Sequence, residues 1–276
     1  MLYLAYGALA QLGAHNTGSV GVRGSSPLCS TIKADAIASA FSNDSLVERI
    51  ETMRRTPLAK RKLPNYSHGE EIFNMVTHIV GGGLGIAFAA LCIIMASIYH
   101  NVYGIVSGAI YGGTIIILYT MSSIYHGLAP RLTAKKVFQI FDHCSIYLLI
   151  AGTYTPYSLV TVRSYSEWMG WSIFGFVWGC AALGITLTAI DLKRFHKFAL
   201  CCYLLMGWCI VVCAIPTFRA LGFWGSFFLL GGGIFYTGGV AFFLVHKPYM
   251  HSVFHLFVLM GSLMQFISIL FFVMPG

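Results

Sequence analysis

Long apolar runs separated by short polar segments dominate the chain, and the runs lack the strict alternation of half-buried strands. No Asp, Glu, Lys or Arg occurs within 72–130, 143–162, 168–190, 198–218, 220–246 or 248–276. About 20 helical residues at a rise of 1.5 Å cross a hydrocarbon core of roughly 30 Å, so each run is long enough to span a bilayer. Backbone groups inside lipid must be satisfied within the segment, and unbroken apolar runs therefore predict helices.

The first of these runs is too long for one crossing and is interrupted by polar and glycine residues at 100–104. Dividing it there gives an all-α, polytopic membrane protein with seven transmembrane helices. The predicted helices cover about 72–99, 103–127, 137–160, 168–190, 197–215, 222–245 and 250–274. Residues 66–276 are thus predicted to form one transmembrane domain. Residues 1–65, which are rich in Ser, Ala and Gly, are predicted to be a flexible cytosolic tail.

The basic residues are divided unequally between the two ends of these helices, and this division predicts the orientation. One side has only Arg163 and Arg219 near its helix ends, and the other has Arg54, Arg55, Lys60, Arg61, Lys62, Arg131, Lys135, Lys136, Lys193, Arg194, Lys197 and Lys247. The positive-inside rule places the second side, with the N-terminus, in the cytosol and leaves the C-terminus outside. The net charge of +8 then reflects basic anchors at an anionic leaflet, and we expect no nucleic-acid partner.

Composition agrees with this reading, because 57% of the residues are hydrophobic and 9% are charged. So few charges do not solvate the surface of a soluble globular domain. We therefore expect an integral, multi-pass membrane protein. The sequence does not identify the membrane.

Three histidines are predicted to meet at the cytosolic ends of two helices. His126 ends the second predicted helix, and His251 and His255 lie four residues apart at the start of the seventh. Residues four apart share a helix face, so this pair can present two imidazoles to one ion, with His126 as a third ligand. Three neutral nitrogen ligands and an open fourth position are typical of catalytic zinc, and Zn²⁺ is the predicted cofactor. The alternative is that the histidine pair only forms hydrogen bonds with a loop at the membrane interface.

Two further residues extend this candidate site. Ser122 lies one turn from His126 on the same helix face, and Asp142 falls within the third apolar segment. A carboxylate in that setting is costly unless a cation or hydrogen-bond donor accepts it, so we predict catalytic roles for both. The open alternatives for Asp142 are that it caps the third helix or pairs with Lys135 or Lys136.

A polar stripe begins the first predicted helix. Glu71, Asn74 and His78 are spaced i, i+3 and i+7, which places them on one face. We predict that they support the metal ligands or contact substrate, and the alternative is that they hold neighbouring helices together.

Together these motifs resemble the hemolysin III family, within the superfamily of progestin and adiponectin receptors. The resemblance rests on ExxNxxTH at 71–78, SxxxH at 122–126, FDHxxIYLLIAGTYTP at 141–156 and HxxxH at 251–255. It implies seven helices, a cytosolic N-terminus and a zinc ion held by His126, His251 and His255, with Ser122 and Asp142 beside it. A more distant similarity to alkaline ceramidases implies hydrolysis of a lipid amide.

Two functional hypotheses follow from these observations. In the first, the protein is a zinc-dependent hydrolase of a ceramide-like lipid amide, and its partner is a membrane lipid or fatty acid. In the second, the zinc site is structural and the protein is a receptor-like membrane component. A pore-forming cytolysin is a weaker third alternative, because the rings of charge that line many conducting pores are absent from the sequence.

Overall fold

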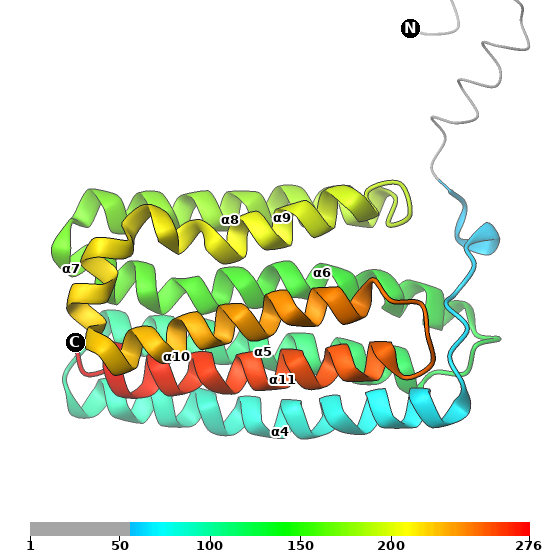
Figure 1. The fold of residues 1–276 in the computed structure, drawn as a ribbon, viewed down its shortest axis with the longest axis horizontal. Helices are drawn as coiled ribbons and strands as arrows, with labels where there is room; N and C mark the ends of the chain where they lie inside the picture. The colour runs from blue at the N-terminus through cyan, green and yellow to red at the C-terminus, as the bar shows by residue number, and fades with distance from the viewer. Residues whose placement is uncertain (1–55) are drawn as a thin grey trace, which may run out of the picture. The chain divides into compact units, whose positions relative to one another are not determined.

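A computed structural model describes residues 56–276, and within them all regular secondary structure is helical. The predicted tail lies mostly outside the described residues. Figure 1 shows the long helices side by side in a bundle. They are α4 (His68–Ile98), α5 (Val102–Gly127), α6 (Thr133–Pro156), α8 (Glu167–Ile190), α9 (His196–Trp208), α10 (Ala214–Phe243) and α11 (Met250–Ser268).

Short elements connect or extend these helices. They are the 3-10 turns η1 (Leu58–Lys60) and η3 (Cys209–Cys213), the π turns η2 (Tyr157–Val162) and η4 (Ile269–Val273), and α7 (Arg163–Tyr165). The predicted break at 100–104 is present: α4 ends at Ile98, and the Asn101 side chain caps α5 by accepting a hydrogen bond from the Gly104 N–H at 2.8 Å. Each predicted segment therefore overlaps one of these helices, with bounds that differ by up to eight residues.

Five continuous helical runs are long and apolar enough to cross a membrane, judged by length and composition. They are His68–Ile98, Val102–Gly127, Glu167–Ile190, His196–Phe243 and Met250–Val273. The fourth run, 48 residues long, contains both α9 and α10. Helix α6 is less apolar than these runs because its first half carries Lys135, Lys136 and Asp142. Large apolar side chains are exposed along the bundle, among them Trp168 at 80% and Val212 at 85%, as expected of a surface that faces lipid.

The helix ends bring distant parts of the chain together at one end of the bundle. This end, which we call the site end, holds the start of α4, the end of α5, the start of α6 and the α10–α11 loop (Figure 1). The Glu70 carboxylate accepts the Tyr249 N–H at 2.7 Å and so joins α4 to that loop. The chain before α4 also lies here, because the Thr56 N–H donates to Asp191 at 2.7 Å and Lys136 donates to the Ala59 carbonyl at 2.9 Å.

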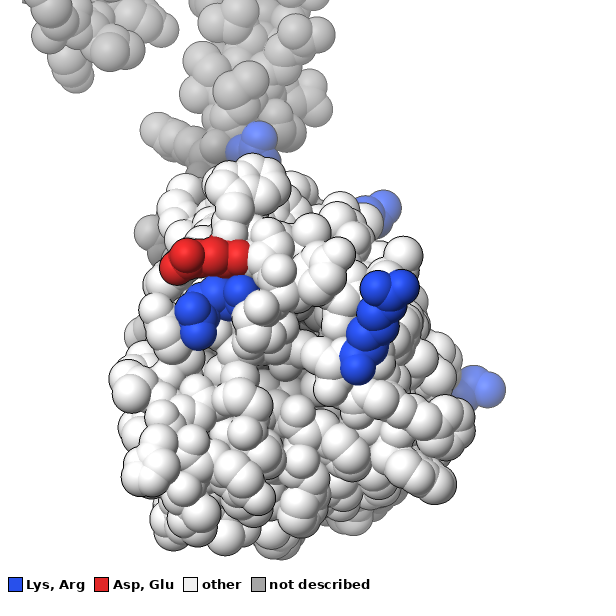
Figure 2. Space-filling model, turned by 90° about the vertical axis from the view of Figure 1, so that its left-hand side faces the viewer, with Lys and Arg blue, Asp and Glu red and all other residues white. Residues whose placement is uncertain are grey.

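The opposite end carries the C-terminus, and few charged side chains are visible on it in Figure 2. The Asn101 amide donates to the Met274 carbonyl at 3.1 Å, which holds the start of α5 against the end of the chain. Arg163 places its guanidinium carbon 3.5 Å from the centre of the Tyr103 ring, a cation–π contact that occupies one of the few cations there.

Candidate metal centre

Three histidine side chains converge at the site end. One ring nitrogen from each of His126, His251 and His255 lies within 4.8 Å of the others. The Nε2 atoms of His251 and His255 are 3.0 Å apart. His126 and His255 are buried, with 3% and 2% of their surface exposed, and His251 is partly buried. The three predicted ligands are therefore close enough to bind one ion.

The start of α11 positions two of these ligands. Tyr249 adopts a left-handed backbone conformation at φ 61° and precedes the first helical residue, Met250. This conformation costs a non-glycine residue free energy, and the hydrogen bond from the Tyr249 N–H to Glu70 compensates for part of it. Because α11 starts here, His251 and His255 occupy its first two turns and share one face.

Glu71 contacts the third ligand directly. Its Oε2 lies 2.6 Å from His126 Nδ1, and its Oε1 lies 2.8 Å from the Lys135 ammonium. An ionised carboxylate only accepts hydrogen bonds, so Nδ1 carries the hydrogen and Nε2 presents its lone pair. Carboxylates that orient metal-binding histidines in this way are common in zinc sites.

Ring nitrogens that lack a hydrogen-bond partner indicate whether a metal ion fits between the histidines. His126 Nε2 is buried and has no hydrogen-bond partner among the described residues. Two ligands of a tetrahedral zinc, each about 2.0–2.1 Å from the ion, are about 3.4 Å apart, which is near the His251–His255 separation. A buried acceptor without a partner is costly, and a cation at this point would satisfy it. The donor set therefore fits zinc.

His78 and Asn74 lie beside the cluster on α4. The His78 ring stacks on His255, with ring centres 3.8 Å apart and an angle of 12° between the planes. Asn74 accepts a hydrogen bond from the Ser252 hydroxyl at 2.7 Å, which ties α4 to α11. Of the predicted polar stripe, Glu71 thus contacts a ligand, His78 packs on another, and Asn74 joins two helices.

Ser122 and Asp142 differ in burial and in their contacts. Ser122 is 1% exposed, one turn from His126 on α5, and its hydroxyl has no partner in the described part of the chain. Asp142 lies in the interior of α6 with its Oδ2 3.6 Å from His143 Nδ1. The two alternatives for Asp142 are wrong: α6 starts at Thr133, and Lys135 and Lys136 contact other groups.

Tyr66, just before α4, covers the cluster. Its ring stacks on His251 with centres 4.9 Å apart and lies 5.7 Å from the ring of His126. Burial, together with the nearby carboxylates of Asp142, Glu71 and Glu70, raises the pKa of the Tyr66 hydroxyl.

Known proteins with similar sequences place the chain in a family. The sequence model described as "Haemolysin-III related" matches residues 66–266. Hemolysin-3 of Bacillus cereus is 41% identical over 208 residues, which cover 75% of this chain and 93% of that protein. A Hemolysin-3 homolog of Bacillus subtilis is 36% identical over 204 residues, or 74% of this chain and 94% of that protein.

The chain belongs to the haemolysin-III related family. This confirms the family inferred from the sequence motifs, and placement among the progestin and adiponectin receptors is consistent with it. Family membership and five apolar helical runs together identify an integral, multi-pass membrane protein.

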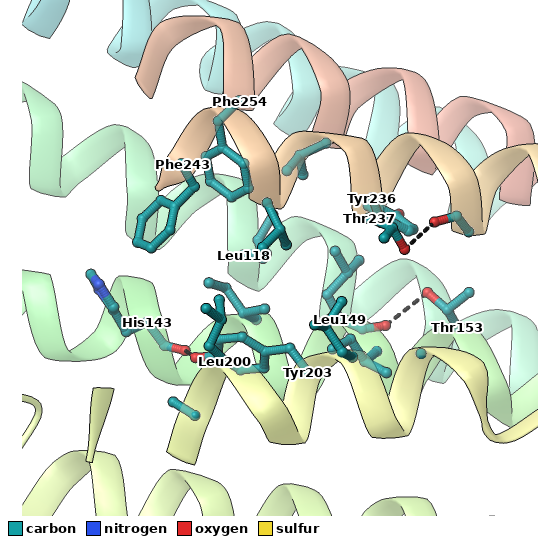
Figure 3. A pocket seen from close by; sticks show the side chains of 18 of the residues that line it. Leu118, His143, Leu149, Thr153, Leu200, Tyr203, Tyr236, Thr237, Phe243 and Phe254 are labelled. Carbon is teal, nitrogen blue, oxygen red and sulfur yellow. Dashed lines mark hydrogen bonds between the residues drawn. The ribbon is translucent and has the colours of Figure 1, made fainter. Parts of the chain in front are cut away.

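Sequence reasoning missed two features of this haemolysin-III related protein. One is the burial of Lys135, whose side chain is 1% exposed. A lysine beside an apolar segment gives no sign in the sequence that it is buried. The other is a cavity of about 140 Å³ between α6, α9, α10 and α11 (Figure 3). Apolar side chains form most of its lining, and two of them, Phe243 and Phe254, have ring centres 5.9 Å and 5.6 Å from that of His251.

Proposed function

We propose that the protein is a zinc-dependent hydrolase of a ceramide-like lipid amide. The observation that supports this best is the convergence of three histidine nitrogens within 4.8 Å, with Glu71 holding the one from α5. When bound, zinc supplies Lewis acidity toward an amide carbonyl and acidifies water.

The chain's own residues would then handle the proton and the developing negative charge. Ser122 is the candidate donor to the oxyanion, because its hydroxyl is buried one turn from His126 and free of other partners within residues 56–276. Asp142 is the candidate base, which takes a proton from water and returns it to the leaving amine. Its carboxylate is only partly buried, with 15% of the side chain exposed, so it can exchange protons with solvent.

The cavity is the proposed site for the acyl chain of the substrate. It is lined mainly by apolar and aromatic side chains, and His143 lines one end of it (Figure 3). Because Phe243 and Phe254 contact both the cavity and His251, an acyl chain held there would place its carbonyl end toward the histidines.

We also propose seven membrane crossings, with the site end and the N-terminus in the cytosol. The basic residues support this orientation, since within residues 56–276 only Arg163 and Arg219 lie near the opposite ends of the helices. Helix α6 is the crossing that is least apolar, and its Lys135 is shielded from lipid by Glu71 and the end of α5.

The test pairs zinc content with fatty-acid release from a panel of lipid amides that includes ceramides. We expect about one zinc per chain, lost in His251→Ala but kept in His246→Ala, whose exposed histidine lies in the loop before α11. Asp142→Asn should keep most of the zinc and reduce the rate roughly 10²- to 10⁴-fold. If the zinc-loaded wild type releases no fatty acid from any amide, the hydrolase proposal is abandoned and the structural zinc site remains.

Membrane damage is a second candidate function, favoured by the name of the Bacillus cereus relative, Hemolysin-3. The same zinc-loaded protein would then release a dye from lipid vesicles without cleaving their lipids. Dye release that persists in Asp142→Asn would support this second function over hydrolysis.

A further inference from the structure

Lys135 is a buried cation that contacts Glu71 and the last carbonyls of α5. Its ammonium lies 2.8 Å from Glu71 Oε1, 2.9 Å from the Leu128 carbonyl and 3.4 Å from the His126 carbonyl. An ammonium has three hydrogens to donate, so these three acceptors use all of them. The charge also lies 5.1 Å from the centre of the Tyr125 ring.

These contacts fix both oxygens of one carboxylate. Lys135 engages Glu71 Oε1, and the other oxygen, Oε2, lies 2.6 Å from His126 Nδ1. The chain of contacts thus runs from α6 through α4 to a ligand on α5. Each member comes from a different helix. Because both oxygens are engaged, the carboxylate cannot rotate without breaking a charged hydrogen bond.

We propose that Lys135 is a positioning residue for the metal centre, acting on His126 through Glu71. Lys135 holds Glu71 in the rotamer that accepts the Nδ1 hydrogen of His126, and Glu71 in turn keeps Nε2 available and aimed at the other two histidines. The inference rests on the proposed metal site but not on hydrolysis. It assigns to a lysine the outer-shell role that usually tunes metal affinity about 10- to 100-fold.

A purely structural role for Lys135 is the competing explanation. The ammonium also binds the last carbonyls of α5, which would stabilise that helix end with or without metal. The two roles predict different effects of the substitution on the stabilisation that zinc adds. A structural lysine lowers the stability of zinc-free and zinc-loaded protein equally, whereas a positioning lysine reduces the stabilisation that zinc adds.

The experiment measures zinc affinity, by competition with a chelator, and the rise in melting temperature on adding zinc to the apo-protein. Lys135→Met removes the ammonium and keeps most of the side-chain volume. Glu71→Gln keeps the shape of the middle member and removes its charge. Lys136→Met is the matched control, because this neighbour on α6 donates to the Ala59 carbonyl instead.

We expect Lys135→Met and Glu71→Gln each to weaken zinc binding about 10- to 100-fold and to reduce the zinc-induced rise in melting temperature. The double variant should lose little more than either single variant, since the two residues act in series. Lys136→Met should bind zinc like the wild type.

Four results would overturn the inference. If Lys135→Met binds zinc as tightly as the wild type, Lys135 has no positioning role, although the zinc site itself stands. If the losses in the two single variants add in the double variant, the residues act independently. If Lys135→Met does not fold, Glu71→Gln decides, and wild-type affinity in that variant rejects the proposal. A wild type that binds no zinc rejects both this inference and the proposed function.

Discussion

Substitution of Gly112 on α5 tests how closely α5, which carries His126, packs against α4, which carries Glu71. A Cβ added at Gly112 would lie 2.7 Å from the Ala89 Cα and 3.3 Å from the Ala89 nitrogen on α4, and it would contact the Ala89 Cβ more closely still. Backbone atoms cannot rotate away, so Gly112→Ala should push α4 and α5 apart by about 1–2 Å, given an ordinary carbon–carbon contact of about 3.5–4.0 Å.

The adjacent glycine supplies the control. A Cβ at Gly113 meets nothing within 4 Å, so Gly113→Ala brings only the better helix propensity of alanine, about 1 kcal/mol. Gly112→Ala brings the same gain together with an overpacking cost of about 1–3 kcal/mol. The difference in stability between the two variants therefore isolates the packing cost, and at about 2–4 °C per kcal/mol it corresponds to roughly 2–12 °C in melting temperature.

The assay is thermal unfolding of the two purified variants in the same detergent, followed by loss of monodisperse protein. Melting temperatures within 1 °C of each other, a margin of about 0.3–0.5 kcal/mol, would refute the close approach of α4 and α5 at Ala89. A second readout is zinc affinity. Gly112 lies about 21 Å along α5 from His126, so a small separation of the helices should reach the site mainly as a tilt and weaken binding less than Glu71→Gln does.

Two other predictions concern the orientation in the membrane and the attachment of the segment before α4. A cysteine introduced beside Lys193 should react only with reagents that enter the cytosol, and one beside Arg219 should react from outside; reversed labelling would contradict the proposed orientation. The second concerns pH. Burial alone would raise the pKa of Asp191, but hydrogen bonds from the Thr56 and Arg194 N–H groups and the nearby charge of Arg61 hold this pKa below its usual value. The attachment of the segment at Thr56 is then complete above the unfolded pKa of about 3.9 and is lost as pH falls through the lower folded value. The protection of the Thr56 amide, measured as its hydrogen-exchange rate relative to the intrinsic rate at each pH, should fall in the wild type as pH drops below about 4 and should be reduced at all pH values in Asp191→Asn.

The helices were predictable because the membrane imposes a simple rule on sequence. Runs without charge longer than a bilayer crossing leave helix as the only structure that satisfies their backbone groups. The break after α4 was also predictable, since Asn101 is a strong helix-capping residue. Helix α6 shows the limit of the rule, because polar residues, among them Lys135 and Asp142, make it less apolar than the five other runs.

The convergence of the three histidines was predictable for a different reason. The spacing of His251 and His255 determines that they share a face, and the alternation of helix direction brings His126 to the same end. What the sequence left open was the pairing of charges. Glu71 was predicted to support the metal ligands or contact substrate, and its carboxylate contacts His126. No spacing rule indicates that Lys135, 64 residues from Glu71 in sequence, lies 2.8 Å from it in space.

The position of the site at helix ends explains why its supporting residues also hold the fold together. At the two ends of a helix, the first N–H groups and the last carbonyls have no partners within the helix, and in a membrane protein other groups must bind them. Lys135 satisfies carbonyls at the end of α5, and Glu70 accepts the Ser67 N–H before α4 and the Tyr249 N–H before α11. These bonds fix the points at which α5 ends and α11 begins, and His126, His251 and His255 lie within two turns of those points. Substitutions that loosen either helix end should therefore weaken metal binding even where they touch no ligand.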